Sequence, residues 1–244
     1  MSTADQQKHH FPERAQVACS QCTLGNLCLP RNLSSADRSE FEHIVNKSRP
    51  LQPGEHLFRA GDKFQSIAAV RAGCFKSYVI DKDGEEQVLG FYLPGEIIGF
   101  DAIHEKVHKA NVVALDTSTV CGLGFDSVSE MARQLPQLQD ELFRVMSLQI
   151  AELEASAADL SAEERIARLL CSLSGRFASR GYSPTEYNLS MSRRDIASNL
   201  RLATETISRV LARFQSAGVI KVNRKKVEIV EMDKLQELAR RDIS

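Results

Sequence analysis

The sequence lacks a long apolar segment: its 244 residues contain no run of about eighteen apolar residues. The first residues, MSTADQQKHHFPER, are polar and lack the apolar core of a secretory signal. These absences argue against a membrane-spanning helix and against a secreted protein. We therefore expect a cytoplasmic protein with no membrane partner.

A strong net charge is also absent, since the formal value is −1, but the charges are unevenly distributed. Residues 161–244 carry sixteen Lys and Arg against ten Asp and Glu, whereas the remainder carries fifteen against twenty-two. A basic C-terminal third on an acidic body favours nucleic-acid binding by that third. A solvated basic surface would give the same balance, so charge alone leaves both interpretations open.

Cysteine is scarce, with six residues, yet three of them are clustered in the segment CSQCTLGNLC. In a reducing compartment, cysteines this close indicate metal ligands or redox groups rather than structural disulfides. The C-x2-C-x5-C spacing of Cys19, Cys22 and Cys28 lets three sulfurs converge on one centre if a further ligand arrives. The candidates for that fourth place are Cys74, Cys121 and Cys171.

Glycines punctuate the chain between residues 51 and 126 and separate short runs rich in Val, Ile, Phe and Tyr. Many short strands joined by tight turns predict an all-β barrel or roll. Residues 75–80 and 87–92 are predicted to form a hairpin, because Asp83-Gly84 supplies the positive φ of such turns. Before this region, residues 34–47 have the pattern of a short helix.

From Pro136 to Leu160 the apolar residues recur at spacings of three and four, which predicts one amphipathic helix. The row of apolar residues along this helix, its seam, suits pairing with a second helix. The seam could instead pack only on the barrel of its own chain. The seam residues are Leu142, Met146, Ile150, Leu153, Ala157 and Leu160. A further helix is predicted over residues 161–177, with Ser161 as its N-cap.

Residues 191–220 have the pattern of a helix-turn-helix. Ser192 can cap a first helix together with Asp195, and a turn follows at residues 201–202. Thr204 is then predicted to cap a second helix, which Gly218 ends in a left-handed conformation. Strands predicted at 219–222 and 227–230 enclose the turn NRKK, a basic wing suited to the DNA backbone.

Four polar residues share the face of the second helix that would enter a major groove. Arginine can donate two hydrogen bonds to guanine, glutamate can accept one from cytosine, and serine can contact a base or a phosphate. An ordinary solvated helix face would look similar, but the whole helix-turn-helix pattern favours DNA binding. The residues are Glu205, Ser208, Arg209 and Arg213.

With these elements in view, the chain resembles the FNR branch of the Crp/Fnr transcription regulators from about Cys19 to its end. The matching stretches are CSQCTLGNLCLP, PLQPGEHLFRAGD, AAVRAGCFKSY, DGEEQVLGFYLPGEIIGFDAI, DTSTVCGLGF, SAEERIARLL and ETISRVLARFQ. The resemblance implies an α+β chain with four parts: an N-terminal Cys-rich iron-sulfur segment (1–34), a cyclic-nucleotide-binding-type β-roll (35–134), a long dimerisation helix (135–160) and a winged helix-turn-helix (161–244).

The resemblance also implies a function, that of an oxygen-responsive regulator of anaerobic metabolism rather than an enzyme. The ligands of its oxygen-labile 4Fe-4S cluster fall on Cys19, Cys22, Cys28 and Cys121, which leaves Cys74 and Cys171 without a cofactor role. Glu205, Ser208 and Arg209 would read a two-fold TTGAT-type DNA site, once in each subunit of a homodimer. Loops at residues 80–85 and 180–184 resemble surfaces that touch RNA polymerase.

Three further expectations concern a cyclic-nucleotide ligand and the alternatives to an FNR-type regulator. Residues 104–115 lack the Arg-Ser pair with which the cAMP-responsive relatives hold a cyclic phosphate, so no cyclic nucleotide is expected. A rival regulator would bind zinc through the three clustered cysteines and His9 or His10, as a structural or thiol-sensing site. A disulfide-exchange enzyme is a less favoured alternative, because the Cys19–Cys22 pair lacks the strand-helix context of a thioredoxin-like site.

Overall fold

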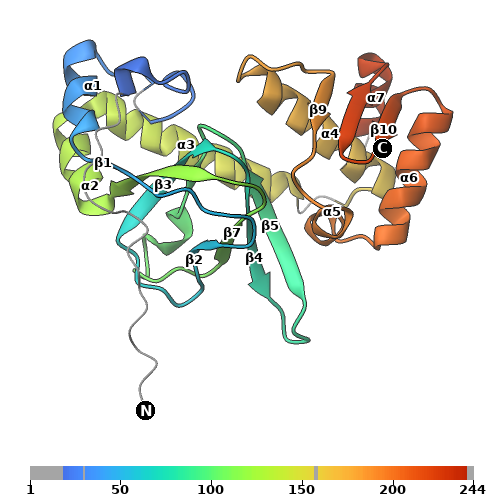
Figure 1. The fold of residues 1–244 in the computed structure, drawn as a ribbon, viewed down its shortest axis with the longest axis horizontal. Coiled ribbons are helices and arrows are strands. Elements are labelled where there is room, and N and C mark those ends of the chain that lie inside the picture. The colour runs from blue at the N-terminus through green and yellow to red at the C-terminus, as the bar shows by residue number, and fades with distance from the viewer. Residues whose placement is uncertain (1–18, 30, 157–158, 241–244) are drawn as a thin grey trace. The chain divides into compact units, whose positions relative to one another are not determined.

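A computed structural model of the chain describes residues 19–29, 31–156 and 159–240, which form both helices and strands (Figure 1). Contacts divide these residues into two compact units. The first comprises the described residues up to Phe75 together with Phe91–Gln149, and the second comprises Lys76–Gly90 together with the described residues from Ile150 onward. No helix in the described part of the chain is long and apolar enough to cross a membrane.

Two four-stranded sheets make up the β-roll, as the spacing of glycines predicts. The first has the order β1-β8-β3-β6 and consists of Val45–Lys47, Thr119–Gly124, Ser66–Ala72 and Ile97–Ile98. The second has the order β2-β7-β4-β5 and consists of His56–Phe58, Asn111–Ala114, Phe75–Ile80 and Glu86–Tyr92. Both sheets supply one apolar core, which includes Leu57, Val70, Phe75, Val112 and Val120. The predicted hairpin is β4–β5, and Gly84 in its turn has a φ of 84°.

The helix predicted over residues 34–47 is shorter in the structure. Ser34 caps α1 (Ser35–Glu42), and the chain then enters β1 (Val45–Lys47). The prediction of a helix at Val45 was wrong because this β-branched residue is buried and pairs with Leu123 of β8. Local spacing alone does not reveal a strand partner nearly eighty residues away.

Two helices follow the roll, α2 (Phe125–Gln134) and α3 (Pro136–Ser156). The helix predicted as far as Leu160 thus ends at Ser156, since Ser161 adopts an extended conformation to cap the next helix; Ala157 lies outside the described residues. Leu138 of α3 is fully buried in the core of the first unit, and Leu142 and Val145 pack against it. The exposed apolar residues on the same helix are Phe143, Leu148, Ile150 and Leu153.

The second unit holds the winged helix-turn-helix. Its helices are α4 (Ala162–Ala178), α5 (Arg193–Leu200), α6 (Thr204–Ser216) and α7 (Met232–Arg240). Its sheet has the order β10-β11-β9 and consists of Ile220–Asn223, Lys226–Ile229 and Glu186–Asn188. Capping boxes begin α4 at Ser161 and α5 at Ser192. The N-cap at Ser161 and the box at Ser192 were predicted from the sequence, whereas the box at Ser161, β9 and α7 were not.

One cap differs from the prediction. Thr204 is the first residue of α6, and Ala203 occupies the N-cap without a side-chain hydrogen bond. The cause lies in the preceding turn, where Arg201 has a left-handed φ of 53° and the N–H of Leu202 bonds to the carbonyl of Ala197. This tight turn starts α6 one residue earlier than a Thr204 cap would allow.

Candidate metal centre and nucleic-acid interface

The three clustered cysteines lie in a segment of consecutive tight turns. The N–H of Cys22 bonds to the carbonyl of Cys19 at 3.2 Å, and that of Gly25 to the carbonyl of Cys22 at 3.0 Å. The N–H of Cys28 bonds to the carbonyl of Leu24 at 3.0 Å. Because each turn reverses the chain, the three cysteines stay near one cavity although eight residues separate the first from the last.

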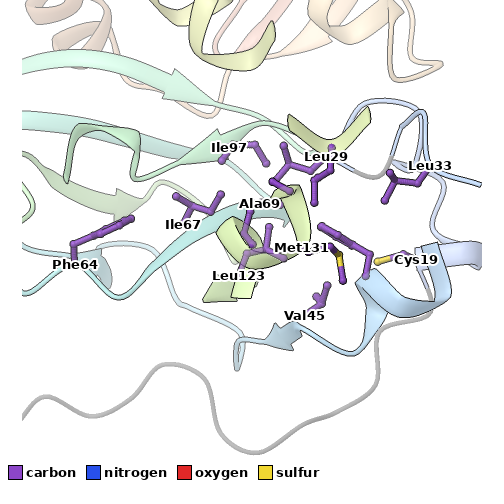
Figure 2. Packing of buried hydrophobic residues seen from close by; sticks show 14 of the residues in the cluster. Cys19, Leu29, Leu33, Val45, Phe64, Ile67, Ala69, Ile97, Leu123 and Met131 are labelled. Atoms are coloured by element: carbon purple, nitrogen blue, oxygen red, sulfur yellow. The ribbon is translucent and has the colours of Figure 1, made fainter. Parts of the chain in front are cut away.

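Cys121 of β8 lies on the same small cavity as these three cysteines. The cavity has a volume of about 30 Å³ and is otherwise lined mainly by apolar groups; its lining residues include Cys19, Cys22, Cys28, Cys121, Phe41, Val45 and Leu123. Figure 2 shows Cys19 in one core with Leu29, Leu33 and Met131. The structure thus brings together the cysteines that the family resemblance selects.

Cys74 and Cys171 lie elsewhere. The backbone N–H of Cys74 donates to Asp116 and to Ser118, and its buried thiol donates to the carbonyl of Phe75. Cys171 lies on α4 in the second unit. Neither lines the cysteine cavity. His9 and His10, the further ligands of the zinc alternative, lie outside the described residues.

Burial dominates the electrostatics of the cavity. It raises the pKa of the Cys19 thiol to about 12, with smaller contributions in the same direction from Cys121, Glu42 and Cys22, and Arg38 opposes them. Burial likewise raises the pKa of Cys28 to about 12. At neutral pH these thiols are protonated, so binding a metal centre there must release protons.

The donor set fits an iron-sulfur cluster or a zinc ion, since both bind four thiolates. Within residues 19–29, 31–156 and 159–240, no three His, Cys, Asp or Glu side chains are already arranged around one metal position. The four sulfurs therefore border one cavity without converging on a single point. The chemistry of the ligands is suitable, and the choice between the two centres is left to experiment.

The cysteine segment is fastened to the rest of the first unit at two further points. Gly95, with a φ of 92°, lies so close to Leu27 that an added Cβ would come within 2.8 Å of the Leu27 side chain. On the other side of Cys28, the Asn32 side-chain amide donates to the carboxylate of Glu141 on α3. Glu141 is only 3% exposed and also accepts a bond from Arg144 at 2.7 Å. The cysteine segment is thus bonded directly to the long helix.

The second candidate site is the outer face of α6. Ile207, Val210 and Phe214 are buried and hold the helix to its domain, which leaves the opposite face exposed. That face presents Glu205, Ser208, Arg209 and Arg213, as the sequence predicts. The Ser208 hydroxyl bonds to the Thr204 carbonyl at 3.1 Å, and Arg213 forms an ion pair with Glu163 of α4. Arg213 is therefore already partnered, whereas Arg209 has no ion-pair partner among the described residues.

A basic hollow lies between the start of α5 and the turn of the wing. Its volume is about 180 Å³, and its lining includes the cations of Arg193, Arg224 and Lys225. Burial alone lowers the pKa of Arg193, and no described carboxylate pairs with any of the three cations. Arg193 is half-buried and the other two are exposed, and cations without counter-ions are suited to binding phosphate. The wing cations are predicted from the sequence, whereas the contribution of Arg193 is not.

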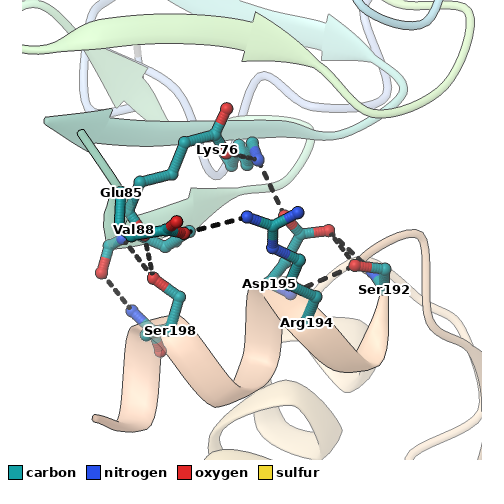
Figure 3. A network of polar contacts seen from close by, with 9 residues as sticks. Lys76, Glu85, Val88, Ser192, Arg194, Asp195 and Ser198 are labelled. Atoms are coloured by element: carbon teal, nitrogen blue, oxygen red, sulfur yellow. Dashed lines mark hydrogen bonds and ion pairs between the residues drawn. The ribbon is translucent and has the colours of Figure 1, made fainter. Parts of the chain in front are cut away.

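Helix α5 is also hydrogen-bonded to the β4–β5 hairpin of the same unit (Figure 3). Lys76 Nζ lies 2.7 Å from Asp195 Oδ1, and Arg194 pairs with Glu85 at 3.0 Å. The Ser198 hydroxyl donates to the Glu86 carbonyl and accepts from the Val88 N–H. Burial opposes the charge on Lys76, but its acidic partners outweigh burial and raise its pKa. These bonds fix the hairpin to the first helix of the helix-turn-helix.

Comparisons with known proteins agree with this architecture. The Crp-like helix-turn-helix domain matches residues 164–238, and the cyclic nucleotide-binding domain matches residues 48–134. The structure of FixK2 from Bradyrhizobium japonicum has a TM-score of 0.73 at 22% identity and covers 80% of this chain and 97% of that one. TTHB099 from Thermus thermophilus, titled a transcriptional regulator of the CRP family, has a TM-score of 0.64 at 22% identity, covering 80% and 98%. These two structures support the fold.

Two relatives are closer in sequence. The transcriptional activator protein Anr of Pseudomonas protegens is 43% identical over 227 residues, which cover 92% of this chain and 93% of Anr. The fumarate and nitrate reduction regulatory protein of Escherichia coli is 39% identical over 226 residues, covering 91% and 90%. Both are regulators, and both span nearly the whole chain. The chain therefore belongs to the FNR branch of the Crp/Fnr family of DNA-binding transcription regulators, and it is not an enzyme.

Proposed function

We propose that the protein is an oxygen-responsive regulator of anaerobic metabolism that binds a 4Fe-4S cluster through Cys19, Cys22, Cys28 and Cys121. The observation that carries this proposal is that all four thiols border one largely apolar cavity. When bound, such a cluster would supply an oxygen-labile group held by four thiolates. The relatives named above support the anaerobic role, because one of them is named for fumarate and nitrate reduction.

The chain itself provides a route from this cavity to the long helix. The segment that carries Cys28 continues to Asn32, which is bonded to Glu141 on α3, and Leu29 and Leu138 lie in the same core. A change in the position of the cysteine segment must therefore act on the first two turns of α3. On this helix Phe143, Leu148, Ile150 and Leu153 are all more than half exposed. We propose that these apolar residues form the contact of a homodimer.

Dimerisation would then determine DNA binding. One helix-turn-helix reads one half-site, so a two-fold TTGAT-type site requires two subunits at a fixed spacing. Glu205, Ser208 and Arg209 would read the bases, while Arg193, Arg224 and Lys225 would hold the phosphate backbone. A ligand-dependent monomer–dimer equilibrium links the two sites because a distant centre can act on DNA only by favouring one of two states.

Three further assignments complete the proposal. The turn of the β4–β5 hairpin and the exposed loop at residues 180–184 are surfaces for RNA polymerase. The roll works without a cyclic nucleotide, because residues 104–115 offer no Arg-Ser pair to clamp its phosphate. Since its target is chromosomal DNA, the protein acts in the cytoplasm.

The experiment compares Cys121→Ala with Cys74→Ala, both purified without oxygen. Cys121→Ala is expected to lose the visible absorption of the cluster, its iron and sulfide, and the tight binding to the two-fold site. Cys74→Ala removes a buried thiol that does not line the cavity and should keep all three properties. A Cys121→Ala variant that still contained iron and sulfide would contradict the proposed ligand set. Stoichiometric zinc in a colourless wild-type protein would instead support the zinc-binding alternative.

A further inference from the structure

Cys121 differs from the other three cysteines in its neighbours, because it lies on a central strand of a sheet. On one side, β1 places Lys47 directly opposite Cys121. On the other side, β3 places Ala69 directly opposite it. Residues that are directly opposite on antiparallel strands share a face of the sheet, with Cβ atoms about 5 Å apart. The half-buried Lys47 side chain therefore lies next to the Cys121 thiol.

A second cation approaches from β3. Arg71 follows Ala69 by two residues, at the point where the β3–β8 register shifts between Val70 and Ala72. It is one of the residues that line the cysteine cavity, and it is the cation whose charge acts most strongly on Cys121. Cys121 thus has one cation on each neighbouring strand.

The positive charges of Lys47 and Arg71 are available to interact with the metal centre. In the part of the chain that the structure describes, no carboxylate forms an ion pair with Lys47 or Arg71. Other cations of the roll do have such a partner: Arg49 is paired with Glu55, Lys109 with Glu105 and Arg133 with Glu130. Two such cations beside the half-buried Cys121 thiol are expected to stabilise negative charge that forms there.

We propose that Lys47 and Arg71 are the counter-charges of the metal centre and stabilise its metal-bound state. Neither residue is a ligand; each is a positioning residue that acts through Cys121. The inference rests on the proposed function in so far as it takes the four cysteines as the ligands.

The net charge of the occupied site explains why the two cations would stabilise the metal-bound state. Four thiolates carry a charge of −4 in total, so a core of charge +2 leaves the occupied site with a net charge of −2. The same total applies to a divalent metal ion and to an oxidised 4Fe-4S core. The occupied site is therefore negatively charged, and both cations stabilise that charge.

Cobalt(II) tests this inference independently of iron chemistry. Full-length protein, kept without oxygen, is titrated with Co²⁺, and the thiolate-to-cobalt absorption reports occupancy of the site. We expect Arg71→Gln and Lys47→Gln each to weaken binding by about tenfold at low salt. Arg71→Lys keeps the charge and should restore most of the affinity. Arg59→Gln is the matched control, because this exposed arginine of the same unit does not line the cavity.

The salt dependence of Co²⁺ binding distinguishes a counter-charge role of the two residues from a purely structural role. Raising the ionic strength screens an exposed counter-charge, so wild-type binding should weaken with salt more steeply than Arg71→Gln binding. Equal affinities in wild type and both Gln variants, or no Co²⁺ binding by the wild type, would overturn the inference. Iron and sulfide are measured in a separate anaerobic wild-type sample. Their absence, together with the expected cobalt results, would contradict the proposed cluster and leave the counter-charges supported.

Discussion

The side-chain amide of Asn32 donates a hydrogen bond to the buried carboxylate of Glu141, and this bond joins the cysteine segment to helix α3. Within the described residues, the other hydrogen bond to this carboxylate comes from Arg144. Leu33, which directly follows Asn32, is buried in the core of the first unit.

Asn32→Ala should therefore destabilise the metal-free protein. The change leaves one oxygen of a buried carboxylate without its donor, which is expected to lower the free energy of unfolding by about 1–3 kcal/mol. Urea unfolding followed by circular dichroism measures the difference. Asn26→Ala is the control from the same segment, since Asn26 is exposed, and it should change stability little. Equal losses in both variants would show that the Glu141 bond is unimportant.

The ion pair of Lys76 with Asp195 predicts a pH dependence. Burial raises the pKa of the Asp195 carboxyl, but hydrogen bonds from Lys76 and Ser192 outweigh it and hold this pKa below its ordinary value. The ionised carboxylate therefore stabilises the fold above the unfolded pKa of about 4, and the contribution is lost as the pH falls through the folded pKa.

Asp195→Asn, which keeps a side-chain acceptor for the helix cap, should lower the free energy of unfolding by about 1–3 kcal/mol at neutral pH. This deficit should shrink as urea titrations are carried from neutral pH to below about pH 4. Glu130→Gln breaks an exposed pair and should have almost no effect. A deficit that stayed constant with pH would contradict the assigned role of the charge.

The order of elements could be predicted from the sequence where local chemistry decides the structure. Ser161 and Ser192 carry complete capping boxes, Gly84 supplies the positive φ of the hairpin turn, and Gly218 ends α6 with a φ of 71°. The errors occur where a distant partner decides. Val45 forms a strand because β8 pairs with it, and β9 exists because β11 offers Tyr187 a partner.

The exposed apolar face of α3 predicts dimerisation. Ile150→Glu and Leu153→Glu each place a charge where a partner helix would bury an apolar side chain, so they should weaken the dimer by at least about tenfold. Ser127→Glu adds the same charge at an exposed position of α2, outside the proposed contact, and should have a smaller effect. Sedimentation of the anaerobic protein measures the equilibrium. Unchanged dimers in both apolar variants would place the contact elsewhere.

DNA-binding measurements on variants can distinguish residues that read bases from residues that contact the backbone. Arg209→Ala should cost about 1–3 kcal/mol on the two-fold site and relax the preference at one base pair. Lys225→Ala should weaken all sequences alike and reduce the slope of log K against log salt by about one for each subunit. Fluorescence anisotropy with matched and mutated sites measures both effects. A loss of base preference in Lys225→Ala would reverse the two roles.

Part of the candidate site could be predicted from the sequence, and part could not. The spacing of Cys19, Cys22 and Cys28 indicates a shared centre by itself, but residues alone left Cys74, Cys121 and Cys171 equal as the fourth ligand. The family resemblance selected Cys121, and the fold explains the selection, because only β8 carries its cysteine to the cavity. Lys47 and Arg71 were missed because their nearness to Cys121 depends on strand register.

Control of DNA binding by a cluster on four cysteines can be tested on a single sample of the wild-type protein. Protein purified without oxygen is analysed for iron, sulfide and affinity for the two-fold site, and the same sample is measured again after exposure to air. The account predicts about four iron and four sulfide per chain, tight binding before exposure, and loss of both cluster and tight binding afterwards. Equal DNA affinity before and after loss of the iron would contradict it.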